Sequence, residues 1–144
     1  MAAITLGGIR ELLLTEHVPG ELTTVVKERR GFCRIAIETG AQLVPVIQFG
    51  EDRTYTRVNW GKNFFVWLRS TIGLAIPFYY GRGPFPHRVP INVVIGGAVK
   101  VKKVANPTKS EIDELHSRYC RALLALYDEH KDAYGYRNIK LKLI

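Results

Sequence analysis

The spacing of apolar residues predicts a short helix followed directly by a strand in the first third of the chain. Phe32, Ile35 and Ala36 stand at positions i, i+3 and i+4, which places them on one face of a helix. Gly40 ends this spacing, and glycine commonly stops a helix because it adopts the left-handed conformation without strain. The next apolar run, residues 43–49, is rich in Val and Ile and too short for a typical helix. We therefore expect it to be a buried strand.

Basic residues precede this helix, and an acidic residue follows the strand. Arg29 and Arg30 come before the first helical turn, with Gly31 beside them, so one helix end would combine unpaired N–H groups with two cations. Glu51 comes just after the strand, a position where binding sites gather in open α/β sheets. We take these four residues as candidate binding residues. The alternative for each arginine is a solvated surface charge.

A second candidate site comes near the N-terminal end of the sequence. Residues 2–6 form a short apolar stretch, followed by Gly7 and Gly8 and then by residues 9–14, whose apolar positions share a helical face. This order predicts a strand, a glycine turn and a helix. Glycines at such a junction let the backbone approach a ligand, and the helix N-terminus can hold an anion. The alternative is a tight turn with no further role.

The remaining pattern predicts a strand at residues 22–26 and either a hairpin-like pair or a bent strand over residues 91–101. Thr108 and Glu111 form a T-x-x-E capping box at the start of a last helix. Gly135 is the expected end of that helix. Helices and strands alternate along the chain, so we predict an α/β fold whose mixed, largely parallel sheet is flanked by helices.

An aromatic segment occupies residues 62–82, with cations beside it. Phe64, Phe65 and Trp67 precede an extended stretch at residues 76–80, and glycine and proline interrupt the run, so it does not predict a transmembrane span. Aromatic side chains beside Lys and Arg suit a membrane surface. We expect this segment to lie in such an interface or to line the entry of a ligand. The alternative is a piece of core with a lid.

Composition and charge narrow the function classes. The chain has 144 residues, 47% of them hydrophobic, which suits one globular domain. Two cysteines do not make a disulfide framework, so a reducing compartment is expected, and no signal peptide precedes the first strand. The formal net charge of +8, from 21 basic and 13 acidic residues, suits an anionic membrane surface or an anionic ligand. The charges are spread along the chain without a nucleic-acid-binding motif, so we expect no nucleic-acid partner.

The sequence lacks the residues of several common catalytic sites. None of the four histidines has a Cys, a Glu or a second His at metal-ligand spacing, so we predict no metal site. A serine hydrolase is excluded because there is no G-x-S-x-G segment. His116 and His130 lie on the expected last helix and are predicted to be packing or surface residues.

Taken together, these segments resemble the C-terminal half of the type-2 diacylglycerol acyltransferase family, which includes monoacylglycerol and wax-ester acyltransferases. The densest match is ungapped and comprises Arg30, Gly31, Phe32, Ala36, Gly40, Leu43, Val44, Pro45, Val46, Phe49, Gly50 and Glu51. An earlier block, Gly-Gly-Ala-x-Glu in the family, is matched by Gly7, Gly8 and Glu11, with Ile9 in place of Ala. Later matches are Phe85, Arg88, Pro90, His116, Tyr119, His130, Lys131, Tyr134 and Gly135.

The resemblance implies an α/β acyltransferase sandwich, of which residues 1–144 are the C-terminal part of a single domain. The family uses acyl-CoA as co-substrate, without a cofactor, and transfers a fatty acyl group to diacylglycerol, which gives triacylglycerol. It acts at the cytosolic face of the endoplasmic reticulum membrane and at lipid droplets. Gly7 and Gly8 would then line the active site, and Glu11 would polarise a histidine or the acceptor hydroxyl. Arg29 and Arg30 would face the coenzyme phosphates, which suit guanidinium geometry.

The general base of the family is a histidine in a His-Pro-His-Gly block, which this sequence lacks. The His-x4-Asp block of more distant glycerolipid acyltransferases is absent too. We therefore expect a C-terminal fragment or a truncated relative that is inactive alone and has an exposed sheet edge. One alternative is a non-catalytic domain that binds a membrane or a partner; another is a monoacylglycerol or wax-ester acyltransferase. The Phe-Gly-Glu ending disfavours a phospholipid-pathway enzyme, and a homo-oligomer stays open.

Overall fold

The computed structural model describes residues 3–4, 20–57, 79–83 and 85–144. The chain divides into two compact units, Met1–Gln48 with Val93–Ile144, and Phe49–Asn92. Several predicted segments lie outside the described residues: most of the first strand, the glycine turn, the helix after it and the aromatic residues 62–78.

The described elements mix helices and strands, which confirms the predicted α/β class. Their order is β1 (Glu21–Thr24), α2 (Gly31–Thr39), β2 (Val46–Phe49), a 3₁₀ turn η1 (Glu51–Arg53), β3 (Thr56–Arg57), β4 (Tyr79–Tyr80), β5 (Asn92–Ile95), α4 (Lys109–His130) and β6 (Lys140–Leu143). Among the described residues, these strands pair as β1 with β6, β2 with β5, and β3 with β4.

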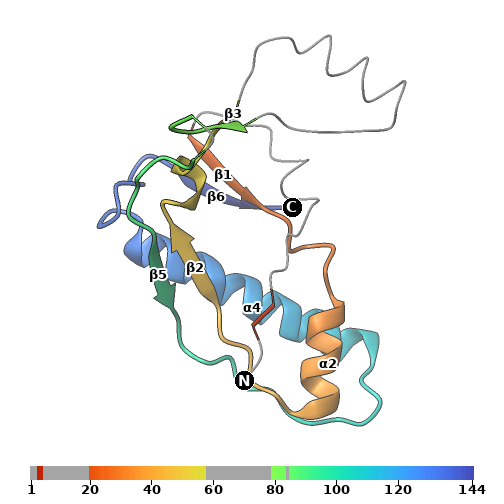
Figure 1. The fold of residues 1–144 in the computed structure, drawn as a ribbon. Coiled ribbons are helices and arrows are strands. Elements are labelled where there is room, and N and C mark those ends of the chain that lie inside the picture. Colours follow the sequence, from red (N-terminus) through yellow and green to blue (C-terminus); the bar gives the residue numbers. More distant parts are fainter. Residues whose placement is uncertain (1–2, 5–19, 58–78, 84) are drawn as a thin grey trace. The chain divides into compact units, whose positions relative to one another are not determined.

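Strands β1 and β6 run parallel, although they are far apart in the sequence (Figure 1). Glu21 pairs with Lys140, and the register continues to Thr24 with Leu143. Strand β6 was not predicted, although its Lys-Leu-Lys-Leu alternation is the two-residue period of a half-buried strand. The predicted strand at residues 22–26 is confirmed as β1, which begins one residue earlier and ends two residues earlier.

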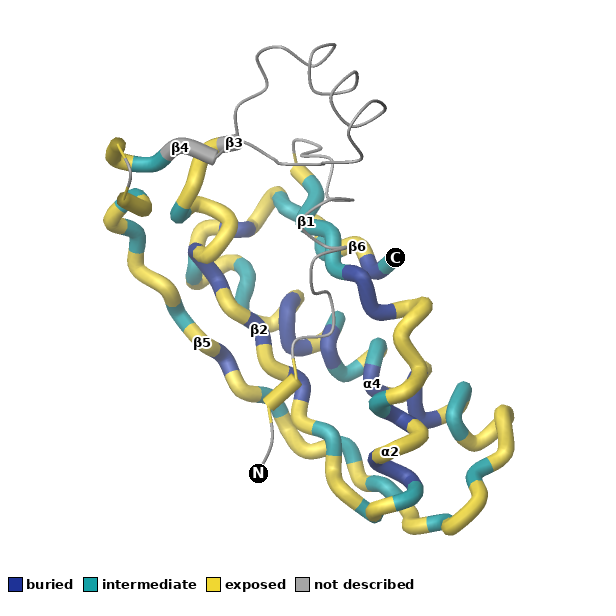
Figure 2. The backbone as a smooth tube through the Cα atoms, turned by 45° about the vertical axis from the view of Figure 1, so that its right-hand side comes forward, coloured by how far each residue is buried: buried dark blue, intermediate teal, exposed yellow. Residues whose placement is uncertain are grey.

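Helix α4 is the largest described element, and its apolar face is buried (Figure 2). The predicted capping box is present: the Thr108 hydroxyl accepts the Glu111 amide at 3.3 Å, and the Glu111 carboxylate accepts the Thr108 amide at 2.8 Å. The pKa of the Glu111 carboxyl is lowered first by the Thr108 amide and next by the Thr108 hydroxyl, which donates to Oε2 of Glu111 at 2.8 Å. The buried residues of the helix are Leu115, His116, Tyr119, Leu123, Leu126 and Tyr127.

The predicted end of α4 at Gly135 is wrong, because the helix ends at His130 with Lys131 as its C-cap. The chain turns back there to bury Tyr136, which is 1% exposed, and the Tyr136 amide donates to the Lys131 carbonyl at 2.8 Å. Gly135 lies in this turn with φ +78°. The glycine therefore closes the turn that follows the helix and does not end the helix.

Helix α2 confirms the predicted helix and its glycine stop. Gly40 caps it with φ +76°, and its amide donates to the Ala36 carbonyl at 2.8 Å. The buried side of α2 packs against α4 in a cluster of Cys33, Ala36, Ile37 and Leu115. This cluster holds α2 beside α4.

The predicted buried strand at residues 43–49 is only partly correct. Strand β2 covers Val46–Phe49, and exposed and buried positions alternate along it (Figure 2). The hairpin predicted as one alternative for residues 91–101 is wrong, because this stretch does not fold back on itself. Its strand β5 pairs with β2. The stretch bends past the β2 segment, where Gly96 donates to Pro45 at 2.9 Å and Val99 exchanges backbone hydrogen bonds with Leu43.

In the unit Phe49–Asn92, Gly50 follows β2 in a conformation that only glycine accepts readily. Its φ is +97°, and a Cβ built on it would lie 2.3 Å from the carbonyl oxygen of Pro90. A backbone atom at this distance cannot move aside without shifting the chain. Gly50 and Pro90 both belong to the family pattern noted in the sequence, and their contact gives that pattern a structural reason.

We predict that Gly50→Ala destabilises the fold. The left-handed backbone alone costs about 1–2 kcal/mol for a residue with a Cβ, and the contact with Pro90 adds to this cost, so thermal unfolding followed by circular dichroism should shift down by roughly 5 °C or more. Gly97→Ala is the matched control, because no atom lies within 4 Å of its built Cβ. Equal melting temperatures for the two variants would contradict this account of Gly50.

Candidate functional site

A turn of exposed cations leads into α2. Lys27, Arg29 and Arg30 are all exposed, and neither Lys27 nor Arg29 forms an ion pair with a described residue. Arg30 is the N-cap residue of α2, whose first turn has no side-chain cap and no acidic residue. We call residues Lys27–Arg30 the basic turn; it places positive side chains beside the positive end of a helix.

The backbone of the basic turn is held at Val26, which is 1% exposed. The carbonyl of Val26 accepts the Arg29 amide at 2.9 Å and the Nε2 of His116 at 3.0 Å. The amides of Val26 and Lys27 both donate to the carbonyl of Ile144 at 2.9 Å. Because a carbonyl oxygen only accepts, Nε2 of the buried His116 carries the hydrogen. His116 is therefore the packing residue that the sequence predicted.

Side chains fix the start of α2 against α4. The Phe32 ring meets Tyr119 edge-on with ring centroids 5.1 Å apart, and it lies 6.1 Å from the His116 ring. Nη1 of Arg30 contacts Oδ1 of Asp113 at 2.6 Å. This pair is half-exposed and contributes at most about 1 kcal/mol, so its main effect is to orient the guanidinium.

This geometry suits an anionic group with several oxygens. A helix N-terminus without a side-chain cap offers amide donors, and the helix dipole favours negative charge there. The guanidinium of Arg29 adds a planar set of donors that matches phosphate. Of the predicted binding residues, Arg29 and Gly31 lie exposed at this helix end, and Arg30 between them pairs with Asp113.

Of the other predicted site residues, Glu51 lies in the second unit, and Gly7, Gly8 and Glu11 lie outside the described residues. Glu51 begins η1 directly after β2, as predicted, but it belongs to the unit Phe49–Asn92. Gly7, Gly8 and Glu11 lie outside the described residues, so their roles stay predictions. In the described part of the chain, the candidate site is therefore the basic turn with the start of α2.

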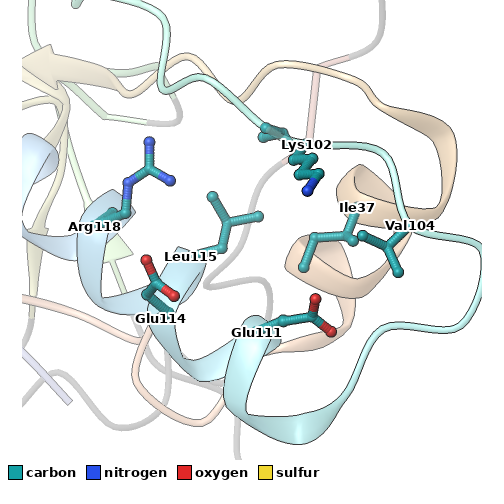
Figure 3. Close-up of a pocket in the computed structure, with 8 residues that line it drawn as sticks. Ile37, Lys102, Val104, Glu111, Glu114, Leu115 and Arg118 are labelled. Carbon is teal, nitrogen blue, oxygen red and sulfur yellow. The ribbon is translucent and has the colours of Figure 1, made fainter.

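A hollow of about 210 Å³ lies beside α4, and none of the residues that line it belongs to the basic turn (Figure 3). The pKa of Glu111 is lowered mainly by its hydrogen bonds with Thr108 and less by the charge of Lys102. Arg118 donates to the Lys100 carbonyl at 3.0 Å. The hollow thus carries balanced charges, and we assign it no ligand. Its lining residues are Ile37, Val101, Lys102, Val104, Glu111, Glu114, Leu115 and Arg118.

The two cysteines are thiols and form no disulfide. Burial, and next the proximity of Cys120, raises the pKa of the Cys33 thiol from 9.0 to about 12. Burial also raises the pKa of Cys120. Because a thiolate is the reactive form, neither side chain is suited to carry an acyl group at neutral pH.

Two other kinds of functional feature are absent from the described residues. No group of three or more His, Cys, Asp or Glu residues there is arranged to hold a metal ion. No helix among those residues has the length and apolarity needed to cross a membrane.

Comparison with known proteins decides the family. A sequence profile described as diacylglycerol acyltransferase matches residues 1–143. The chain belongs to the diacylglycerol acyltransferase family. This confirms the resemblance read from the basic turn, α2 and β2.

Curated relatives of the family are similar along nearly the whole chain. The chain is 37% identical to 2-acylglycerol O-acyltransferase 1 of Bos taurus, a match that covers 94% of this chain and 43% of the relative. It is 38% identical to diacylglycerol O-acyltransferase 1 of Eremothecium gossypii, over 98% of this chain and 33% of the relative. For diacylglycerol O-acyltransferase 2 of Homo sapiens the identity is 34%, over 92% of this chain and 37% of the relative. No solved structure matches the chain.

Two residues of the site were missed by sequence reasoning. Lys27 could have been found, because the run Lys-Glu-Arg-Arg places three cations in four residues. Asp113 could not, since it stands 83 residues from Arg30 and nothing in its local pattern points to that partner.

We predict that Cys33 resists alkylation in the folded chain. With a pKa raised from 9.0 to about 12, the thiol holds about a thousandfold less thiolate at pH 8 than an unperturbed thiol would. Labelling with iodoacetamide at pH 8, read by mass spectrometry, should leave Cys33 unmodified until denaturant is added. Rapid labelling of Cys33 in the native protein would show that it is more accessible than its 0% exposure indicates.

Proposed function

We propose that this chain is the C-terminal part of an acyl-CoA-dependent acyltransferase that transfers a fatty acyl group to diacylglycerol, giving triacylglycerol. Membership of the diacylglycerol acyltransferase family supports the reaction class. The names of the fungal and human relatives support diacylglycerol as the acceptor. The observation that carries the proposal is the anchored basic turn at the start of α2, because coenzyme A is a phosphate-rich anion.

The proposed role of the described residues is to bind and orient acyl-CoA. In the reaction, the acceptor hydroxyl oxygen attacks the thioester carbonyl, an ester C–O bond forms and the C–S bond breaks. The hydroxyl proton leaves through a general base and ends on the coenzyme thiol. The family resemblance assigns that base to the His-Pro-His-Gly block, which this sequence lacks. The neutral cysteine thiols favour direct transfer without an acyl-cysteine intermediate on this chain.

The acceptor and product are lipids, so we propose that the protein works at a membrane surface. The cytosolic face of the endoplasmic reticulum membrane and the lipid droplet are the locations implied by the family resemblance. The net charge of +8 is compatible with an anionic membrane surface.

A monoacylglycerol acceptor is a second candidate. The bovine relative at 37% identity and the mouse relative at 38% are both named 2-acylglycerol O-acyltransferase 1. They are as similar to this chain as the diacylglycerol enzymes are, so the acceptor must be tested directly.

We predict that the 144-residue chain binds coenzyme A through the basic turn. Arg29→Ala should weaken binding about tenfold at low salt, the value expected for one charge-assisted contact. Isothermal titration calorimetry with coenzyme A measures this directly.

The matched control is Arg34→Ala on the same helix. Arg34 is exposed and already pairs with Glu38 at 2.8 Å, one turn along α2, so the control removes an equal charge away from the helix end. An equal effect of both variants would mean that only net charge matters. Absence of binding by the unmodified chain would refute the proposed role of the turn.

We predict that a chimera in which this chain replaces the matching part of the Eremothecium gossypii relative makes triacylglycerol from oleoyl-CoA and diacylglycerol. Radiolabelled product is measured in membranes with diacylglycerol or 2-monoacylglycerol as acceptor. The chimera with Arg29→Ala should show a raised Michaelis constant for oleoyl-CoA, whereas Arg34→Ala should not. Faster turnover of 2-monoacylglycerol than of diacylglycerol would favour the second candidate, and triacylglycerol made by the chain alone would contradict the need for the missing base.

A further inference from the structure

One face of the β2–β5 pair is aliphatic and exposed. Val44 and Val46 on the β2 side are 38% and 46% exposed, and Val93 and Ile95 on the β5 side are 53% and 65% exposed. We call these four residues the outer face. On both strands they alternate with buried residues, so they point to the same side of the pair.

The opposite face of the pair is already covered by α4. The buried Pro45, Ile47 and Val94 lie on that face. A Cβ built on Gly96 would lie 3.0 Å from both Leu126 of α4 and Pro45, which shows how closely helix and strands approach. The outer face therefore cannot be the side that α4 covers.

The sequence of these strands carries no charge on either side, and exposed Gln48 is the polar residue at the end of the outer face. The stretches 43–48 and 93–98 contain no charged residue, in a chain that is 24% charged. Strands with Val and Ile on both faces are typical of sheets with helices packed on both sides. Edge and surface strands normally carry charges that prevent association, and these stretches have none.

We infer that the outer face is a docking surface for an amphipathic helix from the part of the family's chain that this sequence does not span. The match with the bovine relative covers 94% of this chain but 43% of the relative, so more than half of the relative's length lies outside it. A helix about 10 Å wide covers two strands about 4.8 Å apart, and a four-residue strand of about 13 Å needs a helix of about nine residues. The occupant is thus a helix of that length or more with one aliphatic stripe.

Two other occupants fit the outer face less well. Surfaces that bind membranes combine apolar residues with Trp, Tyr, Lys or Arg, and stretches 43–48 and 93–98 contain none of these. A second copy of the chain would find only four side chains here, whereas stable interfaces use about 20–30 residues on each side. The absence of charge and the small area both favour a helix that packs within one domain.

The test is co-expression of this chain with the part of the bovine relative that lies outside the match, each with its own affinity tag. The unmodified chain should capture that part, and Val46→Lys or Ile95→Lys should reduce capture at least tenfold. Ile35→Lys is the matched control, because Ile35 is an equally exposed aliphatic residue, at 57%, on helix α2. Circular dichroism checks that all variants keep the fold.

Three results would overturn the inference. The first is that the unmodified chain fails to capture the partner, or that Val46→Lys captures it equally well. The second is a homodimer in light scattering that Val46→Lys dissociates and Ile35→Lys does not. The third is binding to phosphatidylcholine–phosphatidylserine vesicles that depends on Val46 in the same way. None of these results involves coenzyme A or acyl transfer, so failure of the docking inference would not refute the proposed function.

Discussion

The hydrogen bond between the buried His116 ring and the Val26 carbonyl is the contact on which the candidate site depends. It joins α4 to the point where the chain leaves β1 and enters the basic turn. The same ring lies beside Phe32 at the start of α2, so one side chain fixes both the turn and the helix after it. The hydrogen bonds to the Ile144 carbonyl and the Arg30–Asp113 ion pair hold the same turn from other sides.

Features set by neighbouring residues could be predicted from the sequence. The helix that ends at Gly40 and the capping box of Thr108 and Glu111 follow from backbone and side-chain chemistry within a few residues. Contacts between distant residues could not be predicted in this way. The Arg30–Asp113 ion pair joins residues 83 apart, and the pairing of β1 with β6 joins the two ends of the described chain. No local pattern in Asp113 or Lys140 specifies these partners.

The prediction for residues 43–49 shows a different limit. A continuous run of Val and Ile indicates that both sides of a strand tolerate burial, but it does not say what lies on each side. Within the described chain, α4 covers one side and Val46 is exposed on the other. The sequence was therefore right about the apolar character of the strand and wrong about its environment. The proposed docking of a helix on the outer face would account for the exposure of Val46.

The charges and thiols of the described residues point to a division of roles within the family's domain. In the basic turn, Lys27 and Arg29 are exposed, whereas burial raises the pKa of Cys33 and Cys120. Cationic side chains are thus exposed, and the two thiols are suppressed as nucleophiles. This arrangement suits a segment that holds an acyl donor in position while proton transfer is performed elsewhere.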